Sequence, residues 1–227
     1  MNTPADLSQV LEVLLTSRHS CRGFKPEPVP REVIERMLSM AQRSPSWCNA
    51  QPWQVAITTG AATERFREAM LAPSQPDEGS PHFEWPQEYR GVYQERRREC
   101  GLALYDAVGV TRGDREASAR QASENFRLFG APHVAIITTD AALGTYGAVD
   151  CGAYVANFLL AAQSLGVATI PQAALARRPE RIRQFFGLSK DRLVVCGISF
   201  GWSDPTHPAN GFRTGRAALD AVATFHT

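Results

Sequence analysis

The stretch PSWCNAQPW, residues 45–53, is the most informative in the chain. Its two prolines restrict the backbone, and it carries side-chain amides at Asn49 and Gln51 together with two indoles. Such a loop can offer hydrogen bonds to a heteroaromatic ring while keeping the surroundings apolar. An ordinary proline-rich turn before a strand explains the same residues when the loop is taken alone, so other segments have to decide between the two interpretations.

A second polar segment lies upstream, RHSCR at residues 18–22, directly after a helical pattern. Arg18, Ser20 and Arg22 alternate, so an extended backbone would aim all three side chains the same way. Two guanidinium groups and a hydroxyl on one side form a good clamp for an oxyanion or a phosphate. The alternative is that these cations only complement the dipole at a helix C-terminus.

A third segment, NGFRTGR at residues 210–216, adds Arg213 and Arg216 near the C-terminus, with little acidic company. A flexible charged tail would explain this segment if it stood alone. It would be a coincidence for all three alternatives to hold together, so the three segments are candidates for one binding site.

Periodic apolar patterns between these segments predict a single α+β domain over residues 1–227. Helices are expected at 7–15, 32–43, 61–71, 89–105, 114–129, 150–165 and 178–186. Strands are expected at 53–59, 133–139 and 192–200. Few strands and many helices imply one sheet that is covered on both faces.

The composition narrows the functional classes. Lys and Arg number 24 against 23 Asp and Glu, so no net field favours nucleic acid or an anionic membrane. The five cysteines form no C-x-x-C pair and the five histidines lack metal-ligand spacing, so neither a disulfide framework nor a metal site is expected. No signal peptide or bilayer-length apolar run is recognisable, and the sequence therefore predicts a cytoplasmic protein with reduced thiols.

One motif points to a different class of enzyme. Residues 197–201 read GISFG, which matches the G-x-S-x-G nucleophile elbow of hydrolases, with Asp204 and His207 downstream. The elbow needs a helix directly after Ser199, and the WSDPTHP sequence that follows cannot begin one cleanly. The favoured interpretation of Ser199 is therefore an ordinary strand residue.

Together the three segments resemble the nitroreductase family of flavoenzymes. Residues 18–22 resemble its R-x-S-x-[RK] signature, and residues 45–53 resemble its P-S-x-x-N-x-Q-P-W loop. Residues 150–169 resemble its central helix and the small-residue turn that ends it. The likeness covers nearly the whole chain, and a helical insert at about 73–112 resembles the subgroup of nitrobenzoate and nitrobenzene reductases.

The resemblance implies a nitroreductase-like fold with a mainly antiparallel sheet covered by helices, an intertwined homodimer, and FMN at the subunit interface. NAD(P)H would be the electron donor and a nitroaromatic or quinone-like planar molecule the acceptor, in a ping-pong cycle. No catalytic side chain is expected, because the flavin carries the chemistry. Cofactor-binding positions are expected at Arg18, His19, Ser20, Arg22, Pro45, Ser46, Trp47, Asn49, Asn125, Pro171, Gln172, Ala173, Ala174, Arg213 and Arg216.

The same resemblance implies individual roles at the two ends of the cofactor. Arg18, Ser20 and the two tail arginines would hold the FMN phosphate, and Arg22 would lie near the pyrimidine edge of the flavin. The other subunit would contribute Pro45, Ser46 and Asn49.

The flavin ring and the substrate would meet further residues. A backbone N–H of Ala173 or Ala174 would face flavin N5, and Asn125 would touch the ribityl chain or the pyrimidine edge. Trp47 departs from the family, in which a small polar residue is common at this position, and with Gln51 it is expected to line the substrate pocket. The acceptor therefore stays open: an enal, an aldehyde or a halogenated phenol is an alternative, as is a flavin-binding protein without turnover.

Overall fold

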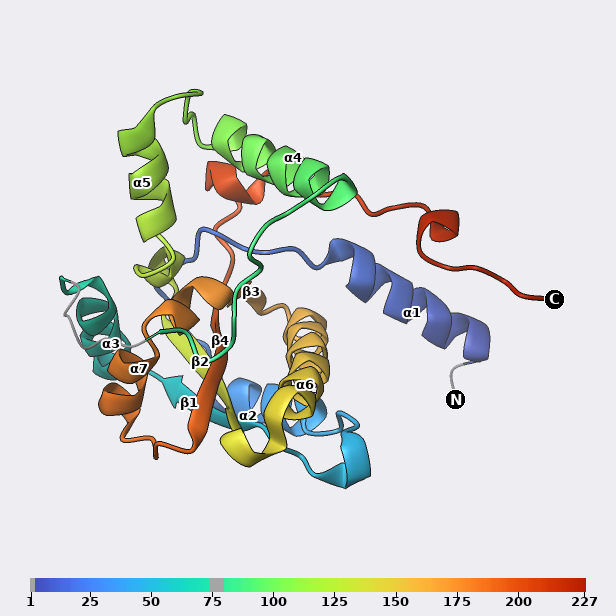
Figure 1. The fold of residues 1–227 in the computed structure, drawn as a ribbon, viewed down its shortest axis with the longest axis horizontal. Coiled ribbons are helices and arrows are strands. Elements are labelled where there is room, and N and C mark those ends of the chain that lie inside the picture. Colours follow the sequence, from blue (N-terminus) through green and yellow to red (C-terminus); the bar gives the residue numbers. More distant parts are fainter. Residues whose placement is uncertain (1–2, 74–79) are drawn as a thin grey trace.

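The computed structural model describes residues 3–73 and 80–227 (Figure 1). Its helices and strands, in chain order, are α1 Pro4–Ser17, α2 Arg31–Ala41, β1 Gln54–Thr58, α3 Ala61–Leu71, α4 Val92–Ala107, α5 Arg115–Ser123, β2 His133–Asp140, α6 Gly144–Ser164, β3 Ala168–Gln172, α7 Pro179–Phe186 and β4 Arg192–Gly201. Residues 74–79 of the predicted insert lie outside the described residues, and α4 falls within the rest of it. None of the described helices is long and apolar enough to cross a membrane.

The four strands form one antiparallel sheet in the order β1-β2-β4-β3. The two central strands are apolar runs, and every residue of β2 is buried except Asp140 at its end. Such runs suit strands that are covered on both faces. The predicted α+β fold with a central antiparallel sheet is therefore confirmed.

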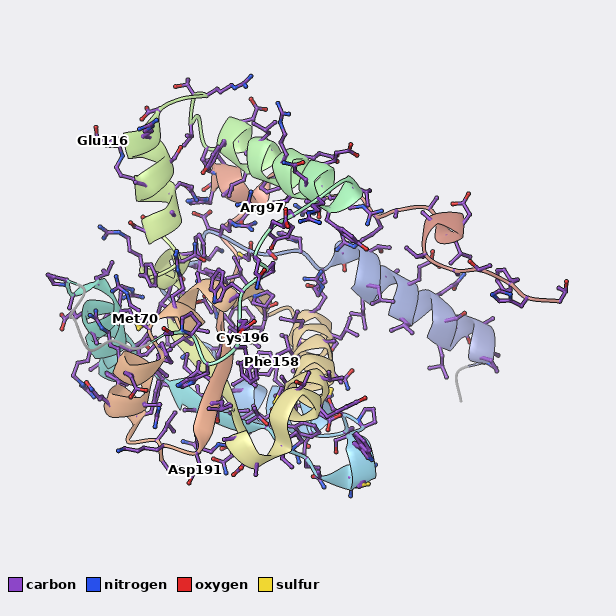
Figure 2. The ribbon with its side chains drawn as sticks, viewed as in Figure 1. Met70, Arg97, Glu116, Phe158, Asp191 and Cys196 are labelled. Atoms are coloured by element: carbon purple, nitrogen blue, oxygen red, sulfur yellow. The ribbon has the colours of Figure 1, made fainter. Side chains whose placement is uncertain are left out.

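Helices cover both faces of this sheet. Strand β2 points alternate side chains to opposite sides, so it supplies apolar residues to a core on each face. Ala135 and Ile137 pack into one core with α2 and α6, while Val134 and Ile136 pack into the other with α3 and α7. Figure 2 shows Phe158 of α6 near the centre of the molecule, beside the sheet. The Phe158 ring meets that of Phe200 of β4 at 5.9 Å, so α6 is fixed directly against a central strand.

Strand β3 is absent from the sequence prediction, which expected a turn ending at residue 169 and a flavin contact after it. The strand has five residues and contains Pro171, which lacks a backbone N–H and weakens a strand pattern. It forms nevertheless, because it pairs with β4 along Ala168–Gln172. A parallel bridge between Thr169 and Ser20 extends the sheet to the first arginine segment.

Two helix boundaries differ from the prediction. The helix expected over 114–129 ends at Ser123, and the chain turns through Leu128 and Phe129 with φ values of +59° and +52°. Such angles are unfavourable for large side chains, but both residues are buried in the second core. The helix expected from residue 150 begins at Gly144, which adds Tyr146 to its first turns.

Helix α1 and the C-terminal segment leave much of their apolar surface exposed. Both extend to the same side of the molecule (Figure 1). Helix α1 has no buried residue, although it carries a row of large aliphatic side chains. The exposed apolar side chains of the two segments are Leu7, Val10, Leu11, Val13, Leu15, Leu219, Val222 and Phe225.

We expect acid to destabilise the fold through His133. This buried ring accepts a hydrogen bond at Nε2 from the Val29 N–H at 2.9 Å and contacts the Thr58 carbonyl through Nδ1 at 3.2 Å. Burial lowers the pKa of His133 in the folded protein, whereas the pKa of this ring in the unfolded chain is about 6.5. The unfolded chain therefore takes up the proton at a higher pH than the folded protein does. Its contribution to stability is therefore complete above that pH and is lost as the pH falls towards the folded-state pKa, by at most about 1.4 kcal/mol per pH unit.

Urea unfolding at pH 7.5 and pH 5.5 measures this effect. A His133→Gln variant can keep an acceptor and a donor but cannot titrate, so its free energy of unfolding should fall less on acidification. Burial also lowers the pKa of His19 and His82, and these groups contribute equally to both proteins. An equal fall in the variant and the wild type would contradict this role of His133.

Candidate cofactor-binding site

Two of the three candidate segments meet in one cavity of about 300 Å³. We call it the arginine cavity. It is lined by Leu15, Thr16, Arg18, His19, Ser20, Arg22, Cys100, Phe212, Arg213, Thr214 and Arg216. Four guanidinium groups thus come together from the two ends of the chain, and no carboxylate lines the cavity.

The first arginine segment is extended, as its alternating pattern predicts. Arg18 is the residue at which α1 ends, and its backbone is already in the β region. Ser20 bridges Thr169 of β3, and the Cys21 N–H donates to the Thr169 carbonyl at 3.0 Å. The segment is therefore a short extension of the sheet rather than a frayed helix end.

The four guanidinium groups have no carboxylate partner within the part of the chain that the structure describes. Arg213 donates from Nη1 to the main-chain carbonyls of Asn210 and Phe212, both at 2.8 Å. Arg22 lies over the Phe212 ring at 5.9 Å. Burial lowers the pKa of Arg18 and of Arg22, and the nearby Arg216 lowers that of Arg18 further.

His19 provides a further sign that the cavity is built for an anion. Its Nδ1 contacts the Ser17 carbonyl at 3.2 Å, which makes Nδ1 the donor, and its Nε2 is buried without a partner. Burial is the main cause that lowers the pKa of His19, and Arg213, Arg18 and Arg22 lower it further. In the neutral ring Nε2 is an acceptor, and it becomes a donor when the ring takes up a second proton, which a bound anion would favour. A phosphate could then accept hydrogen bonds from His19 and from guanidinium groups that have no carboxylate partner.

Asn210, which the sequence interpretation did not single out, joins the two arginine segments. This residue is buried, at 7% exposure. Its Oδ1 accepts the Arg22 N–H at 2.7 Å, and its Nδ2 donates to the carbonyls of Gly23 and Asp204, both at 2.9 Å. Because buried amide groups are costly to leave unpaired, these bonds fix the second arginine segment against the first.

The loop 45–53 lies elsewhere on the chain. Asn157 of α6 donates to Ser44 Oγ at 2.7 Å, and the Trp47 N–H donates to the Asp150 carboxylate at 3.2 Å and 3.3 Å. Ser17, beside the arginine cavity, is bonded by Gln163 of the same helix. These α6 contacts lie 6 and 13 residues before Gln163, which is about 9–20 Å along the helix axis.

One chain therefore places the loop and the arginine cavity on separate surfaces. Trp47 is 60% exposed, and Asn49 and Gln51 are also exposed. This separation agrees with the expectation that Pro45, Ser46 and Asn49 act on the cofactor of another subunit, which stays a prediction.

The region after β3 shows which groups are available to a ligand. Gln172 is buried, and its amide accepts Ser199 Oγ at 2.5 Å and donates to the Asn125 carbonyl at 2.9 Å. Any contact of Gln172 with a cofactor therefore falls to its backbone. Ala173 is exposed and Ala174 half-buried at the start of a 3-10 turn, Ala173–Arg177. Ser199 lies buried inside β4, as the strand interpretation requires.

Comparison with known proteins agrees with this fold and site. The model of the nitroreductase family matches residues 15–202. Nitroreductase NfnB of Mycolicibacterium smegmatis is 34% identical over 97% of this chain and 94% of its own length, and a 4-nitrobenzoate reductase of Pseudomonas putida is 30% identical over 96% of both. The crystal structure of FMN-dependent NfnB from Mycobacterium smegmatis in complex with NADPH superimposes with a TM-score of 0.92 at 34% identity, covering 98% of this chain and 100% of that one.

Fold and site thus define a flavoenzyme-like α+β protein, and the chain belongs to the nitroreductase family. The resemblance inferred from the segments 18–22, 45–53 and 210–216 is confirmed at the level of the family. No group of His, Cys, Asp and Glu that could hold a metal ion occurs among residues 3–73 and 80–227.

We expect Asn210→Ala to weaken FMN binding by more than its loss of stability explains. The substitution leaves the Arg22 N–H without its partner and takes one hydrogen bond from each of two carbonyls, which keep main-chain partners. The free energy of unfolding should fall by about 1–3 kcal/mol. It also releases Arg213 relative to Arg22, so the FMN Kd should rise at least about tenfold. FMN titration and urea unfolding of the same preparations measure both effects.

Asn157→Ala provides a matched control, because it removes a half-buried amide of α6 that donates to Ser44. It should reduce stability while changing FMN affinity much less. Equal FMN affinities for Asn210→Ala and the control would show that Asn210 does not organise the cavity.

Proposed function

We propose that this protein is an FMN-dependent oxidoreductase that takes electrons from NAD(P)H and reduces nitroaromatic or quinone-like planar acceptors in a ping-pong cycle. The observation that carries the proposal is the arginine cavity, where four guanidinium groups and an orphaned histidine nitrogen face one another without a carboxylate. Relatives named as nitrobenzoate and nitrobenzene reductases, 30% and 31% identical, support the choice of acceptor.

The phosphate end of FMN would be held in the arginine cavity. Arg18, Arg213 and Arg216 would supply charge-assisted hydrogen bonds, and Ser20 a hydroxyl. The phosphate would also offset the cations that lower the pKa of His19, so that the protonated ring adds one more donor. Each such bond to a charged group is worth about 1.5–3 kcal/mol. The anion also removes the mutual repulsion of the cations, so binding should stabilise the folded chain.

The flavin end would extend from this cavity along β3. Ser20 bridges Thr169, and Ala173 lies four residues further on, about 13 Å away along an extended strand. The first backbone N–H groups of the turn that begins at Ala173 have no partner within the turn and are available to flavin N5. Arg22 also lines a neighbouring cavity on the α5 side, where it can stabilise negative charge at the pyrimidine edge.

When bound, FMN supplies the hydride- and electron-transfer chemistry, and this chain's residues bind and orient it. The arginines fix the phosphate and the main chain after β3 fixes the ring, so donor and acceptor can use the same exposed face in turn. No side chain has to act as an acid or base.

The proposal includes a homodimer. Helix α1 and the C-terminal segment together expose eight large apolar side chains, and contiguous exposed apolar surface marks interaction sites. A second subunit would cover them and bring Pro45, Ser46, Trp47 and Asn49 to the flavin. All five cysteines are unpaired, which supports the further inference of a reducing, cytoplasmic location.

The first test is the colour of the purified protein. We expect the absorbance bands of oxidised flavin in the wild type and much less flavin in Arg18→Ala and Arg213→Ala, because each removes a phosphate ligand. Full FMN occupancy in both variants would refute the phosphate assignment. Anaerobic NAD(P)H should bleach the bound flavin, whereas a flavin-binding protein without turnover would stay oxidised.

The dimer is tested by light scattering after gel filtration. The wild type should have twice the mass of one chain, and Val10→Glu, which places a charge in the exposed apolar row of α1, should dissociate it and release FMN. Gln9→Glu adds the same charge at an exposed polar neighbour and should leave the dimer intact. A wild-type monomer with bound FMN would contradict the shared site.

A further inference from the structure

Trp47 and Tyr146 form an exposed aromatic pair outside the arginine cavity. Their rings meet edge to face, with centroids 4.5 Å apart and an interplanar angle of 79°. Each side chain belongs to a residue that is 60% exposed. A favourable aromatic pair that still presents so much surface is suited to stack on a further ring.

The pair is held in place by α6 and by the loop itself. Tyr146 and Asp150 are four residues apart on α6 and therefore share one face of the helix. The Tyr146 ring supports the Trp47 indole, while the Asp150 carboxylate accepts a hydrogen bond from the main-chain N–H of Trp47. The loop is closed by a bond from the Gln51 N–H to Ser46 Oγ at 2.9 Å.

The backbone around Trp47 is strained. Cys48, Asn49 and Gln51 have φ values of +51°, +54° and +48°, which residues with side chains rarely adopt. Strain of this kind persists where the surrounding structure imposes it, and it is common at binding sites. The fold therefore imposes the conformation of the loop that carries the indole.

The pair opens onto a cavity of about 320 Å³ with a mainly apolar lining. Ala50, Leu143 and Gly147 provide much of that lining. Asp150 is the one charged residue there, and its carboxylate would repel an anionic ligand. No arginine or lysine lines the cavity to offset that charge.

We propose that the Trp47–Tyr146 pair is the specificity-determining wall of the acceptor site, with Tyr146 positioning Trp47, and that it selects uncharged planar nitroaromatics over carboxylated ones. The inference rests on the proposed function, since the loop must reach the flavin of a second subunit. Relatives named as nitrobenzene and 4-nitrobenzoate reductases are almost equally similar to this chain, so overall similarity does not distinguish between the two acceptors.

The experiment compares nitrobenzene, 4-nitrobenzoate and ferricyanide, an acceptor without a ring. For each protein we would measure KM and kcat, and the Kd of nitrobenzene for the oxidised enzyme from the perturbation of its flavin absorbance. Tyr146→Ala and Trp47→Ser should raise the Kd and KM for nitrobenzene about 3- to 10-fold, with a smaller change in kcat. Tyr146→Phe keeps the ring contact and should retain the wild-type Kd.

Asp150→Asn tests the charge separately, because the amide oxygen can still accept the Trp47 N–H. It should lower the KM for 4-nitrobenzoate while leaving that for nitrobenzene unchanged. Val149→Ala, an equally exposed position of α6 outside the cavity, is the matched control and should alter none of these constants.

An unchanged nitrobenzene Kd in both Tyr146→Ala and Trp47→Ser would overturn the proposal, as would an equal effect of Asp150→Asn on the two nitroaromatics. A ferricyanide KM that rises as much as that for nitrobenzene would also overturn it, because the wall would then act on the flavin and not on the ring of the acceptor. A protein without FMN, or without NAD(P)H-dependent bleaching, would instead refute the proposed function itself.

Discussion

The amide of Asn210 holds together two segments that carry like charges. Its oxygen accepts the main-chain N–H of Arg22, 188 positions away in the sequence. The main-chain carbonyl of the same residue accepts a hydrogen bond from Arg213. Burial lowers the pKa of Arg18 and of Arg22, and the nearby Arg216 lowers that of Arg18 further, so gathering these cations costs free energy. A bound phosphate would offset this cost. A cluster of cations that lacks carboxylate partners and is held by a buried amide therefore favours our proposal of a phosphate site.

Helix α6 holds the two parts of the proposed cofactor site apart within one chain. It lies against the centre of the sheet, and near its C-terminal end it bonds Ser17, the residue before Arg18. Closer to its N-terminal end it bonds Trp47 of the loop 45–53 and Ser44 just before that loop. The helix therefore separates the arginine cavity from the loop that carries Trp47. The site that we propose requires a second copy of the loop, which agrees with the exposed apolar surfaces of α1 and of the tail.

Much of the fold follows from local sequence. The apolar runs of β2 and β4 and the nearly all-apolar α6 need few long-range contacts to be identified. Strand β3 cannot be predicted in this way, because it has only five residues and Pro171 interrupts its pattern. The strand is stabilised by pairing with β4. The arginine segments can be found from the sequence, because their arginines have no neighbouring acidic residues. Asn210 and Tyr146 cannot, because their roles depend on contacts between residues distant in the sequence, and Tyr146 also precedes the predicted start of its helix.

If the arginine cavity binds the phosphate of FMN, a flavin without that phosphate must bind far more weakly. The most direct measurement compares the Kd of FMN with that of riboflavin, which has the same ring but no phosphate, using protein freed of its flavin. We expect FMN to bind at least about 100-fold more tightly than riboflavin, since several charge-assisted hydrogen bonds are lost with the phosphate. Equal affinities for the two flavins would contradict it.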